Sequence, residues 1–329
     1  MTVAGLWTVT CGVNAAVRIT FYVLRFTARP YPHPMPRWQK ITVAGVGLLG
    51  GSIGMAVKQR RLAGCVSGLV RRQESIAECV EVGAVDEAFT DPARAVEDAD
   101  LVLLCTPIAQ MPSRVAKLLP ALKRGAIVTD VGSVKGTVVA ELEPLVAGAG
   151  AEFIGSHPMA GAEKMGVGAA RPDLFEGAVC VVTPTANSSK EVVRQVEEFW
   201  KALGGRPLQM SAEQHDDLVS RSSHLPHVVA AELANYVLSP AHAKEQAMLC
   251  ATGFRDTTRV ASGSPEMWRD IAIANRQNLA RVLGVFIEDL QEFQRALETQ
   301  DTKAIEEFFR QAKERRDAWQ ASSASPSSE

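Results

Sequence analysis

A glycine-rich loop at residues 45–50, with the sequence GVGLLG, constrains the fold of this 329-residue chain more than any other feature. The loop directly follows an apolar, β-rich run and precedes an apolar helical segment. In a GxGxxG loop, the first glycine permits a tight turn, the second lets the backbone approach a pyrophosphate, and the third allows close helix–strand packing. The start of the following helix then offers free N–H groups to the phosphates. The pattern predicts a dinucleotide-binding site formed by Gly45, Gly47, Leu48, Leu49 and Gly50.

Strand and helix patterns alternate through the first half of the chain, which predicts βαβ units and a mostly parallel sheet. The candidate strands are residues 41–46, 66–70, 101–105, 126–131, 153–154, 179–182 and 206–210. After residue 211 only helical periodicity remains, with apolar residues spaced four and three apart over 283–297. We therefore expect an α/β Rossmann-type dinucleotide-binding domain over 35–185 and an all-α substrate and dimerisation domain over 186–319.

The two ends of the chain differ from these domains. Residues 1–34 are predicted to be a disordered extension or an over-extended gene start, because a second methionine, Met35, stands just before the first structural signal. Residues 320–329 are rich in serine and alanine and are predicted to be a disordered tail. The apolar stripes of the C-terminal helices exceed what one small bundle needs, which predicts a homodimer through these helices.

Composition excludes several classes of protein. The 35 Lys and Arg residues balance 37 Asp and Glu residues, whereas nucleic acids and anionic membranes select a basic excess. Structural zinc sites commonly use pairs of cysteines in CxxC spacing, and none of the six cysteines forms such a pair. We expect reduced thiols, a cytoplasmic location, no metal site and no membrane span.

The choice between NAD and NADP depends on the end of the second predicted strand. NAD sites usually carry an Asp or Glu there, about 20 residues beyond the glycine loop, to bind the ribose 2′-hydroxyl. Here residues 69–73 read LVRRQ, so Arg71 and Arg72 take that place. A guanidinium pairs with the 2′-phosphate of NADP. NADP is therefore favoured over NAD, with a solvated arginine pair as the alternative, and Thr106 and Pro107 are further candidate cofactor contacts.

Two polar segments follow later strands, at the carboxyl edge where open α/β sheets bind ligands. Ser133 lies in the segment 129–135 (TDVGSVK), and His157 lies in the segment 155–161 (GSHPMAG). A lone histidine is more often structural than catalytic. A histidine beside a cleft nevertheless titrates near neutrality and accepts a substrate proton. We expect His157 to act as a base and Ser133 to hydrogen-bond either that histidine or a substrate hydroxyl.

Three segments of the helical half carry further polar residues. They are 223–227 (SHLPH), 253–259 (GFRDTTR) and 267–270 (MWRD). Arg255 and Arg259 stand four residues apart, and an arginine fork suits a carboxylate. We expect one of the two to form surface ion pairs and the other to face the cleft.

These six motifs occur in the order found in prephenate/arogenate dehydrogenases of tyrosine biosynthesis, and residues 38–318 resemble that family. The resemblance implies that His157 accepts the proton of a cyclohexadienol 4-hydroxyl, that Ser133 orients both groups, and that Arg259 binds a substrate carboxylate. It also implies that Ser223, His227, Glu163 and Trp268 line the substrate pocket. Hydride would pass to the nicotinamide, and loss of CO2 with aromatisation would make the reaction irreversible.

Several alternatives stay open at this point. Prephenate and arogenate differ only in a side-chain keto or amino group, and a hydrogen bond donated by His227 to the keto acid favours prephenate. An arogenate or dual-specificity cyclohexadienyl dehydrogenase is the main alternative. β-Hydroxyacid dehydrogenases and imine reductases share the same two-domain plan. A non-catalytic NADP-binding regulator would keep residues 45–50 but has no need of Ser133, His157 and Arg259 together.

Overall fold

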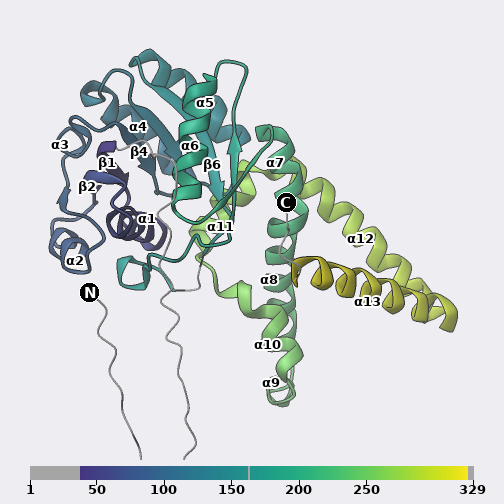
Figure 1. Cartoon of the computed structure of the whole chain (residues 1–329). Coiled ribbons are helices and arrows are strands. Elements are labelled where there is room, and N and C mark those ends of the chain that lie inside the picture. The colour runs from purple at the N-terminus through teal and green to yellow at the C-terminus, as the bar shows by residue number, and fades with distance from the viewer. Residues whose placement is uncertain (1–37, 162–163, 325–329) are drawn as a thin grey trace, which may run out of the picture. The chain divides into compact units, whose positions relative to one another are not determined.

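The computed structural model describes residues 38–161 and 164–324 (Figure 1). The N-terminal extension, Glu163 and residues 325–329 lie outside the described residues. An eight-stranded sheet with the order β3-β2-β1-β4-β5-β6-β7-β8 dominates the first part of the chain. Its strands are β1 Trp38–Ala44, β2 Ala63–Leu69, β3 Glu87–Phe89, β4 Leu101–Leu104, β5 Ile127–Asp130, β6 Glu152–Pro158, β7 Val179–Thr183 and β8 Arg206–Gln209.

Helices cover both faces of this sheet, as expected for strands whose apolar residues run continuously. The α-helices are α1 Leu48–Gln59, α2 Ser75–Glu81, α3 Pro92–Val96, α4 Met111–Leu118, α5 Gly136–Gly148 and α6 Lys190–Ala202, with short 3-10 turns η1 Ile108–Gln110, η2 Leu119–Ala121 and η3 Val167–Ala169. Alternate residues of β4 point to opposite faces, so Leu103 packs in the core beneath α1 and α6, and Leu104 packs beneath α3, α4 and α5. The predicted α/β fold is confirmed.

The pairing of the strands gathers several loops at one edge of the sheet. Strands β3, β2, β1, β4, β5 and β6 are parallel neighbours, whereas β7 pairs antiparallel with β6 and β8 runs parallel to β7. Ala44 at the end of β1 lies beside both Leu69 and Leu104, and Leu104 lies beside Asp130. The segments that follow β1, β2, β4 and β5 therefore meet at the carboxyl edge, where the polar motifs were expected.

The expected domain boundary at residue 185 is wrong in one respect. Strand β8 pairs in parallel with β7, and α6 buries Val196, Phe199 and Trp200 in the core on one face of the sheet. The α/β part of the chain therefore continues to Gln209. The amphipathic face of α6 belongs to the sheet rather than to the helical part of the chain. The short strand β3 was not predicted, because three residues are too few to show a pattern.

Only helices follow β8 among the described residues, as predicted. They are α7 Ala212–Val219, the π-helical turn η4 Ser220–His224, α8 Leu225–Val237, α9 Glu245–Met248, α10 Thr252–Thr258, the 3-10 turn η5 Arg259–Ser262, α11 Pro265–Ala274, α12 Arg276–Glu298 and α13 Thr302–Ala324. The π-turn lies directly before Pro226, whose missing N–H interrupts the helical hydrogen-bond pattern.

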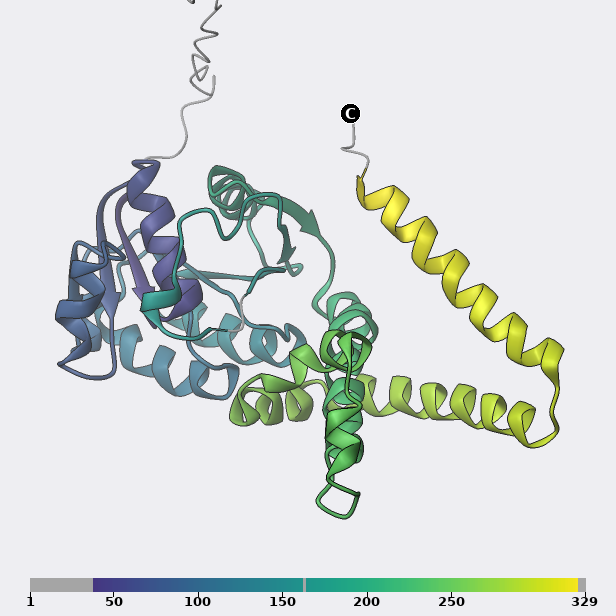
Figure 2. The same ribbon diagram turned by 90° about the horizontal axis from the view of Figure 1, so that it is seen from below.

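The predicted disordered tail starts too early. Helix α13 continues through residues 320–324 to Ala324, because alanine favours helix and the first helix-breaking residue in the sequence is Pro326. Figure 2 shows α12 and α13 as two long helices joined by a short turn. Phe293 packs against Phe308 and Phe309 across that turn.

Large apolar side chains remain exposed along the helical part. They are Tyr236, Leu238, Met248, Leu249, Ile273, Val285, Ile287, Leu290, Leu297, Phe308, Phe309 and Trp319. Several of them, such as Val285, Leu290 and Leu297, lie on the same long helix α12. Within the described part of the chain, no helix has both the length and the apolar character needed to span a bilayer.

Candidate active site

The glycine loop adopts the geometry that its sequence predicts. Gly45 has φ +104°, and a Cβ at this position would lie 2.8 Å from the carbonyl oxygen of Cys105. A Cβ on Gly50 would lie 2.1 Å from the Gly45 carbonyl oxygen, so helix α1 packs directly against the turn. A Cβ on Gly47 would meet nothing within 4 Å, which leaves that side of the loop open. The first and third glycines are therefore required by packing, and the second lies beside free space.

Two further observations test whether a dinucleotide fits this loop. No side chain caps the N-terminus of α1, so its first N–H groups are available to phosphate oxygens. The hydroxyl of Thr106 is buried and has no hydrogen-bond partner within the described residues. Thr106 lies against the glycine turn, because a Cβ on Gly45 would be 3.0 Å from its Cγ2. An uncapped helix and an unpaired hydroxyl beside it are consistent with a bound dinucleotide.

Arg71 and Arg72 lie just beyond the end of β2, and both are exposed. The Leu69 carbonyl oxygen accepts a hydrogen bond of 2.9 Å from the Gly45 N–H, so this end of β2 adjoins the glycine loop. Pro107 follows Thr106 and precedes η1. The structure thus brings together all the predicted cofactor-binding positions.

A buried ion pair lies below the loop that follows β5. The Lys135 ammonium is fully buried and pairs with the equally buried Asp130 carboxylate. It also donates to the Ser156 carbonyl oxygen at 2.8 Å. The Asp130 carboxylate accepts from the Ser156 N–H at 3.0 Å and from the Gly132 N–H at 2.8 Å. These contacts tie β6 to the segment after β5, which carries Ser133.

His157 stands near the carboxyl end of β6 and is 8% exposed. Its Nδ1 lies 2.9 Å from Nε2 of His215, and Nδ1 of His215 lies 2.8 Å from the Asp216 carboxylate. Burial, followed by the nearby His215, Lys135 and His224, lowers the pKa of His157 well below its ordinary value. His157 is therefore a neutral imidazole at pH 7, as a proton acceptor must be.

His224 forms the other side of this cluster. Its Nδ1 lies 3.1 Å from the Asn275 side-chain amide, which also donates to the Asp216 carbonyl oxygen at 2.8 Å. Burial lowers the pKa of His224 to about 4. The backbone of Ser133 contacts His224. Ser133 therefore belongs to the same cluster, although no hydrogen bond joins its hydroxyl to His157 within the described part of the chain.

Three of the predicted pocket residues lie together where η4, the start of α8 and α11 meet: Ser223, His227 and Trp268. The His227 ring stacks on Trp268 with centroids 3.7 Å apart, and its Nδ1 donates to the Ser223 carbonyl oxygen at 2.9 Å. Burial lowers the pKa of His227, and the nearby Arg259 guanidinium acts in the same direction. The structure thus places Arg259 close to the pocket side chains, as predicted.

Sequence reasoning missed several members of the cluster. They are Asp130, Lys135, His215, Asp216 and Asn275, all of which are buried. The burial of Lys135 was the easiest of these features to detect from the sequence. Its charge stands between Val131 and Val134 on one side and Val138 and Val139 on the other. His215 and Asp216 lie in a polar helical segment whose sequence resembles an ordinary exposed helix.

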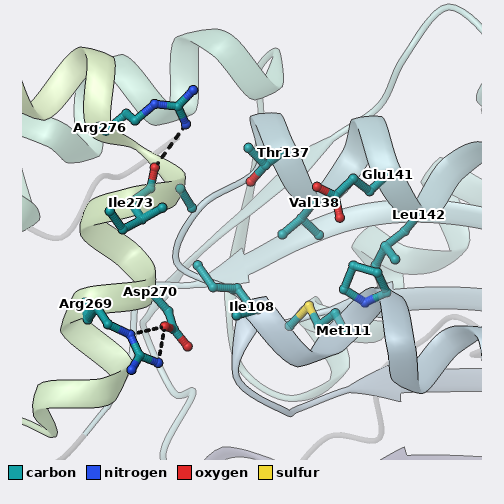
Figure 3. A pocket seen from close by; sticks show the side chains of 13 residues that line it. Ile108, Met111, Thr137, Val138, Glu141, Leu142, Arg269, Asp270, Ile273 and Arg276 are labelled. Carbon is teal, nitrogen blue, oxygen red and sulfur yellow. Dashed lines mark hydrogen bonds and ion pairs between the residues drawn. The ribbon is translucent and has the colours of Figure 1, made fainter.

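A separate pocket of about 430 Å³ opens between α4, α5 and α11 (Figure 3). Apolar side chains such as Met111 and Leu142 form its floor, and the Arg269–Asp270 ion pair stands at one side (Figure 3). None of the predicted site residues lines it. We place the candidate site at the histidine cluster, because this pocket holds two carboxylates, Glu141 and Asp270, but no histidine and none of the predicted site residues.

Comparisons with known proteins agree with this arrangement. The family described as prephenate dehydrogenase, nucleotide-binding domain, matches residues 53–209, and the prephenate dehydrogenase dimerization domain matches residues 211–311. Prephenate dehydrogenase of Bacillus subtilis is 33% identical over 84% of this chain and 75% of its own length. Cyclohexadienyl dehydrogenase of Zymomonas mobilis is 34% identical over 86% of this chain and 96% of its own length.

A solved structure gives the same result. Prephenate dehydrogenase from Aquifex aeolicus, in complex with hydroxyphenyl propionate and NAD+, has a TM-score of 0.79 and 32% identity. The match covers 85% of this chain and 98% of that one. The division between the two matched domains falls at residue 210, where β8 ends and the helical part begins. The chain therefore belongs to the prephenate dehydrogenase family.

Proposed function

We propose that the chain catalyses the oxidative decarboxylation of prephenate to 4-hydroxyphenylpyruvate with NADP or NAD. The observation that carries this proposal is the position of His157, a buried neutral imidazole at the carboxyl edge of the sheet. Gly45, Gly47, Gly50 and Thr106 hold the dinucleotide. The bound nicotinamide supplies the hydride acceptor, and loss of CO2 leaves an aromatic ring.

The residues of this chain then have distinct tasks. His157 accepts the proton of the ring hydroxyl, which allows the electrons of that O–H bond to form a C=O bond. Ser133, on the neighbouring loop, orients the hydroxyl. Arg259 binds a substrate carboxylate beside His227 and Trp268. The enzyme needs only to position the substrate beside the cofactor and to supply one proton acceptor, because aromatisation drives the reaction forward.

The proposal is tested by a two-by-two assay on purified protein, with prephenate or arogenate and with NADP or NAD. We expect reduced-nicotinamide absorbance to appear with prephenate, at the higher kcat/KM with NADP. In the neutral state His227 donates from Nδ1 to Ser223, so its Nε2 accepts a hydrogen bond and would not donate to a keto group. The sequence-based reason for preferring prephenate thus needs a protonated His227, and the assay decides the substrate directly. Absence of turnover in all four combinations would contradict the proposed function.

Replacing Arg259 with alanine is expected to raise the KM for the substrate about 100-fold, with a smaller change in kcat. The lost interaction joins two charged groups, and hydrogen bonds of that kind contribute roughly 1.5–3 kcal/mol. Steady-state kinetics with Arg255→Ala as the matched control checks this, because Arg255 lies one helical turn away and is also exposed. An unchanged KM in Arg259→Ala would remove Arg259 from the substrate site.

The NADP preference is proposed on the positions of Arg71 and Arg72 beside the glycine loop. Replacing both with alanine should raise the KM for NADP about 30-fold, because a charge-assisted contact to the 2′-phosphate is lost. The KM for NAD, which lacks that phosphate, should change less than about threefold on the same reasoning. An equal effect on both cofactors would show that these arginines do not distinguish them.

We also propose that two chains form a homodimer through the exposed apolar side chains of the C-terminal helices. Helix α12 buries only Leu279 and Val282 within the chain, while Val285, Leu290 and Leu297 stay exposed.

The described cysteines are all unpaired, which supports a reducing, cytoplasmic location.

A further inference from the structure

A chain of hydrogen bonds leads from the proposed base into the interior of the protein. His157 Nδ1 and His215 Nε2 are 2.9 Å apart, and His215 Nδ1 is 2.8 Å from the Asp216 carboxylate. His215 is fully buried and Asp216 is 5% exposed. Neither residue belongs to the six sequence motifs. His215 contacts His157, and Asp216 contacts both His215 and the start of α5.

The hydrogen-bond roles along this chain follow from its inner end. The Asp216 carboxylate accepts 2.8 Å hydrogen bonds from the backbone N–H groups of Lys135 and Gly136. A carboxylate can only accept, so the proton between it and His215 resides on His215 Nδ1. A neutral His215 then has an unprotonated Nε2, and the proton between the two histidines resides on His157 Nδ1.

The result is a defined tautomer of His157. With its proton on Nδ1, the neutral ring has its lone pair on Nε2, and that nitrogen is free to accept the proton of a substrate hydroxyl. The opposite tautomer would hold a proton on Nε2 and would be unable to do so.

Rigid elements hold the inner end of the chain in place. The Lys135 and Gly136 amides belong to the start of α5, whose N-terminal dipole favours a negative charge. The Asn275 amide, at the junction of α11 and α12, donates to the Asp216 carbonyl oxygen. Lys135 faces the cluster from the β5–α5 loop, and His224 faces it from η4. Both lower the pKa of His157 and so favour its neutral form.

We infer that His215 and Asp216 are positioning residues that hold His157 as its Nδ1–H tautomer and so keep Nε2 available as the proton acceptor. This inference rests on the proposed function for its kinetic consequences, but not for the tautomer itself. Removing the partner that sets the tautomer of a histidine base costs up to about 10⁴-fold in kcat where this has been measured.

Two substitutions of His215 separate the tautomer role from a packing role. In His215→Gln, the side-chain oxygen can reach the position of Nε2 and still accept from His157. In His215→Asn, the shorter amide reaches only the position of Nδ1 and keeps the contact with Asp216. Both variants remove a buried ring and replace it with a neutral amide, so their packing losses are similar. Asp217→Asn is the control, because Asp217 is adjacent but forms only surface ion pairs with Arg221 and Arg281.

We expect kcat with prephenate to fall about 100-fold in His215→Asn and less than about tenfold in His215→Gln, as for other losses of an oriented base. The KM values and the cofactor dissociation constant should stay within about threefold in both, since neither residue touches a ligand. Equal losses in the two variants, or a fall below threefold in His215→Asn, would overturn the inference.

A measurement on the ligand-free protein keeps the inference independent of the substrate. Nitrogen-15 NMR of labelled histidines distinguishes protonated from unprotonated ring nitrogens, and the spectrum of His157→Asn assigns the His157 signals. We expect the wild-type protein to show His157 protonated on Nδ1 alone, and His215→Asn to lose this single-tautomer pattern. A wild-type signal with the proton on Nε2 would overturn the inference, whichever substrate the enzyme uses. Absence of turnover with a correct NMR pattern would instead count against the proposed function.

Discussion

Replacing His157 with asparagine is expected to lower kcat about 1,000-fold, within the range for loss of a positioned proton acceptor. Asparagine keeps a hydrogen-bonding group at this place on β6 but cannot accept a proton at neutral pH. The KM for prephenate should change little, because the substrate carboxylates are assigned to other residues. Steady-state kinetics under saturating cofactor, with cofactor binding measured separately, checks this result.

The same variant separates an enzyme from a non-catalytic regulator that binds NADP. A regulator would show no turnover to lose, and its cofactor affinity would depend on Gly45 and Thr106 rather than on His157. If His157→Asn turned prephenate over at close to the wild-type rate, the assignment of the base would be wrong. The β-hydroxyacid dehydrogenases and imine reductases, which share the two-domain plan, would then become the better comparison.

The pH profile of the wild-type enzyme should show the altered environment of this base. Burial lowers the pKa of His157 below the ordinary histidine value of about 6.5. The neutral form that accepts a proton therefore persists to lower pH than for an exposed histidine. We expect the acid limb of kcat/KM to be centred well below the ordinary histidine value, and a limb at or above that value would show that another group controls it.

The sequence alone was sufficient to predict the parts of the fold that depend on local patterns. The glycine loop lies between a strand and a helix as expected, because backbone conformation there is dictated by residues 45–50 themselves. His157 and Ser133 were predicted from their places after two strands, and His227 and Trp268 from the resemblance. The structure places His157 and Ser133 in one cluster with His224, and stacks His227 on Trp268 beside it. The chemistry of each was readable from its type and from the strand end or helix that carries it.

The features that were missed depend on contacts between segments distant in sequence. Lys135 meets its partners on two strands, and Asp216 meets the start of α5 about 80 residues away. Helix α6 shows the same limitation, since an amphipathic stripe gives no indication of which neighbour it packs against. Its assignment to the sheet required β8, whose pairing with β7 no local pattern specifies.

Replacing Lys135 with methionine is expected to lower the free energy of unfolding by about 3–5 kcal/mol, the usual cost of leaving one buried charge without its partner. That is a large fraction of the roughly 5–15 kcal/mol that separates folded from unfolded states in most proteins. Methionine fills a volume similar to that of the lysine stem, so the loss measures the unpaired Asp130 carboxylate rather than a cavity. Urea unfolding followed by tryptophan fluorescence gives the change, because Trp200 is fully buried beside the sheet.

The double variant Asp130→Asn, Lys135→Met shows whether charge is the cause. Removing both charges leaves the Ser156 and Gly132 amides with a neutral acceptor, so part of the lost stability should return. An exposed pair such as Lys313–Asp317 is the control, since losing one surface partner typically changes stability by less than about 1 kcal/mol. If the double variant were less stable than Lys135→Met alone, the Asp130 carboxylate would be stabilised by the backbone amides without its lysine. Lys135 would then act mainly on the electrostatics of the histidine cluster, and its loss should raise the pKa of His157 and move the acid limb of activity to higher pH.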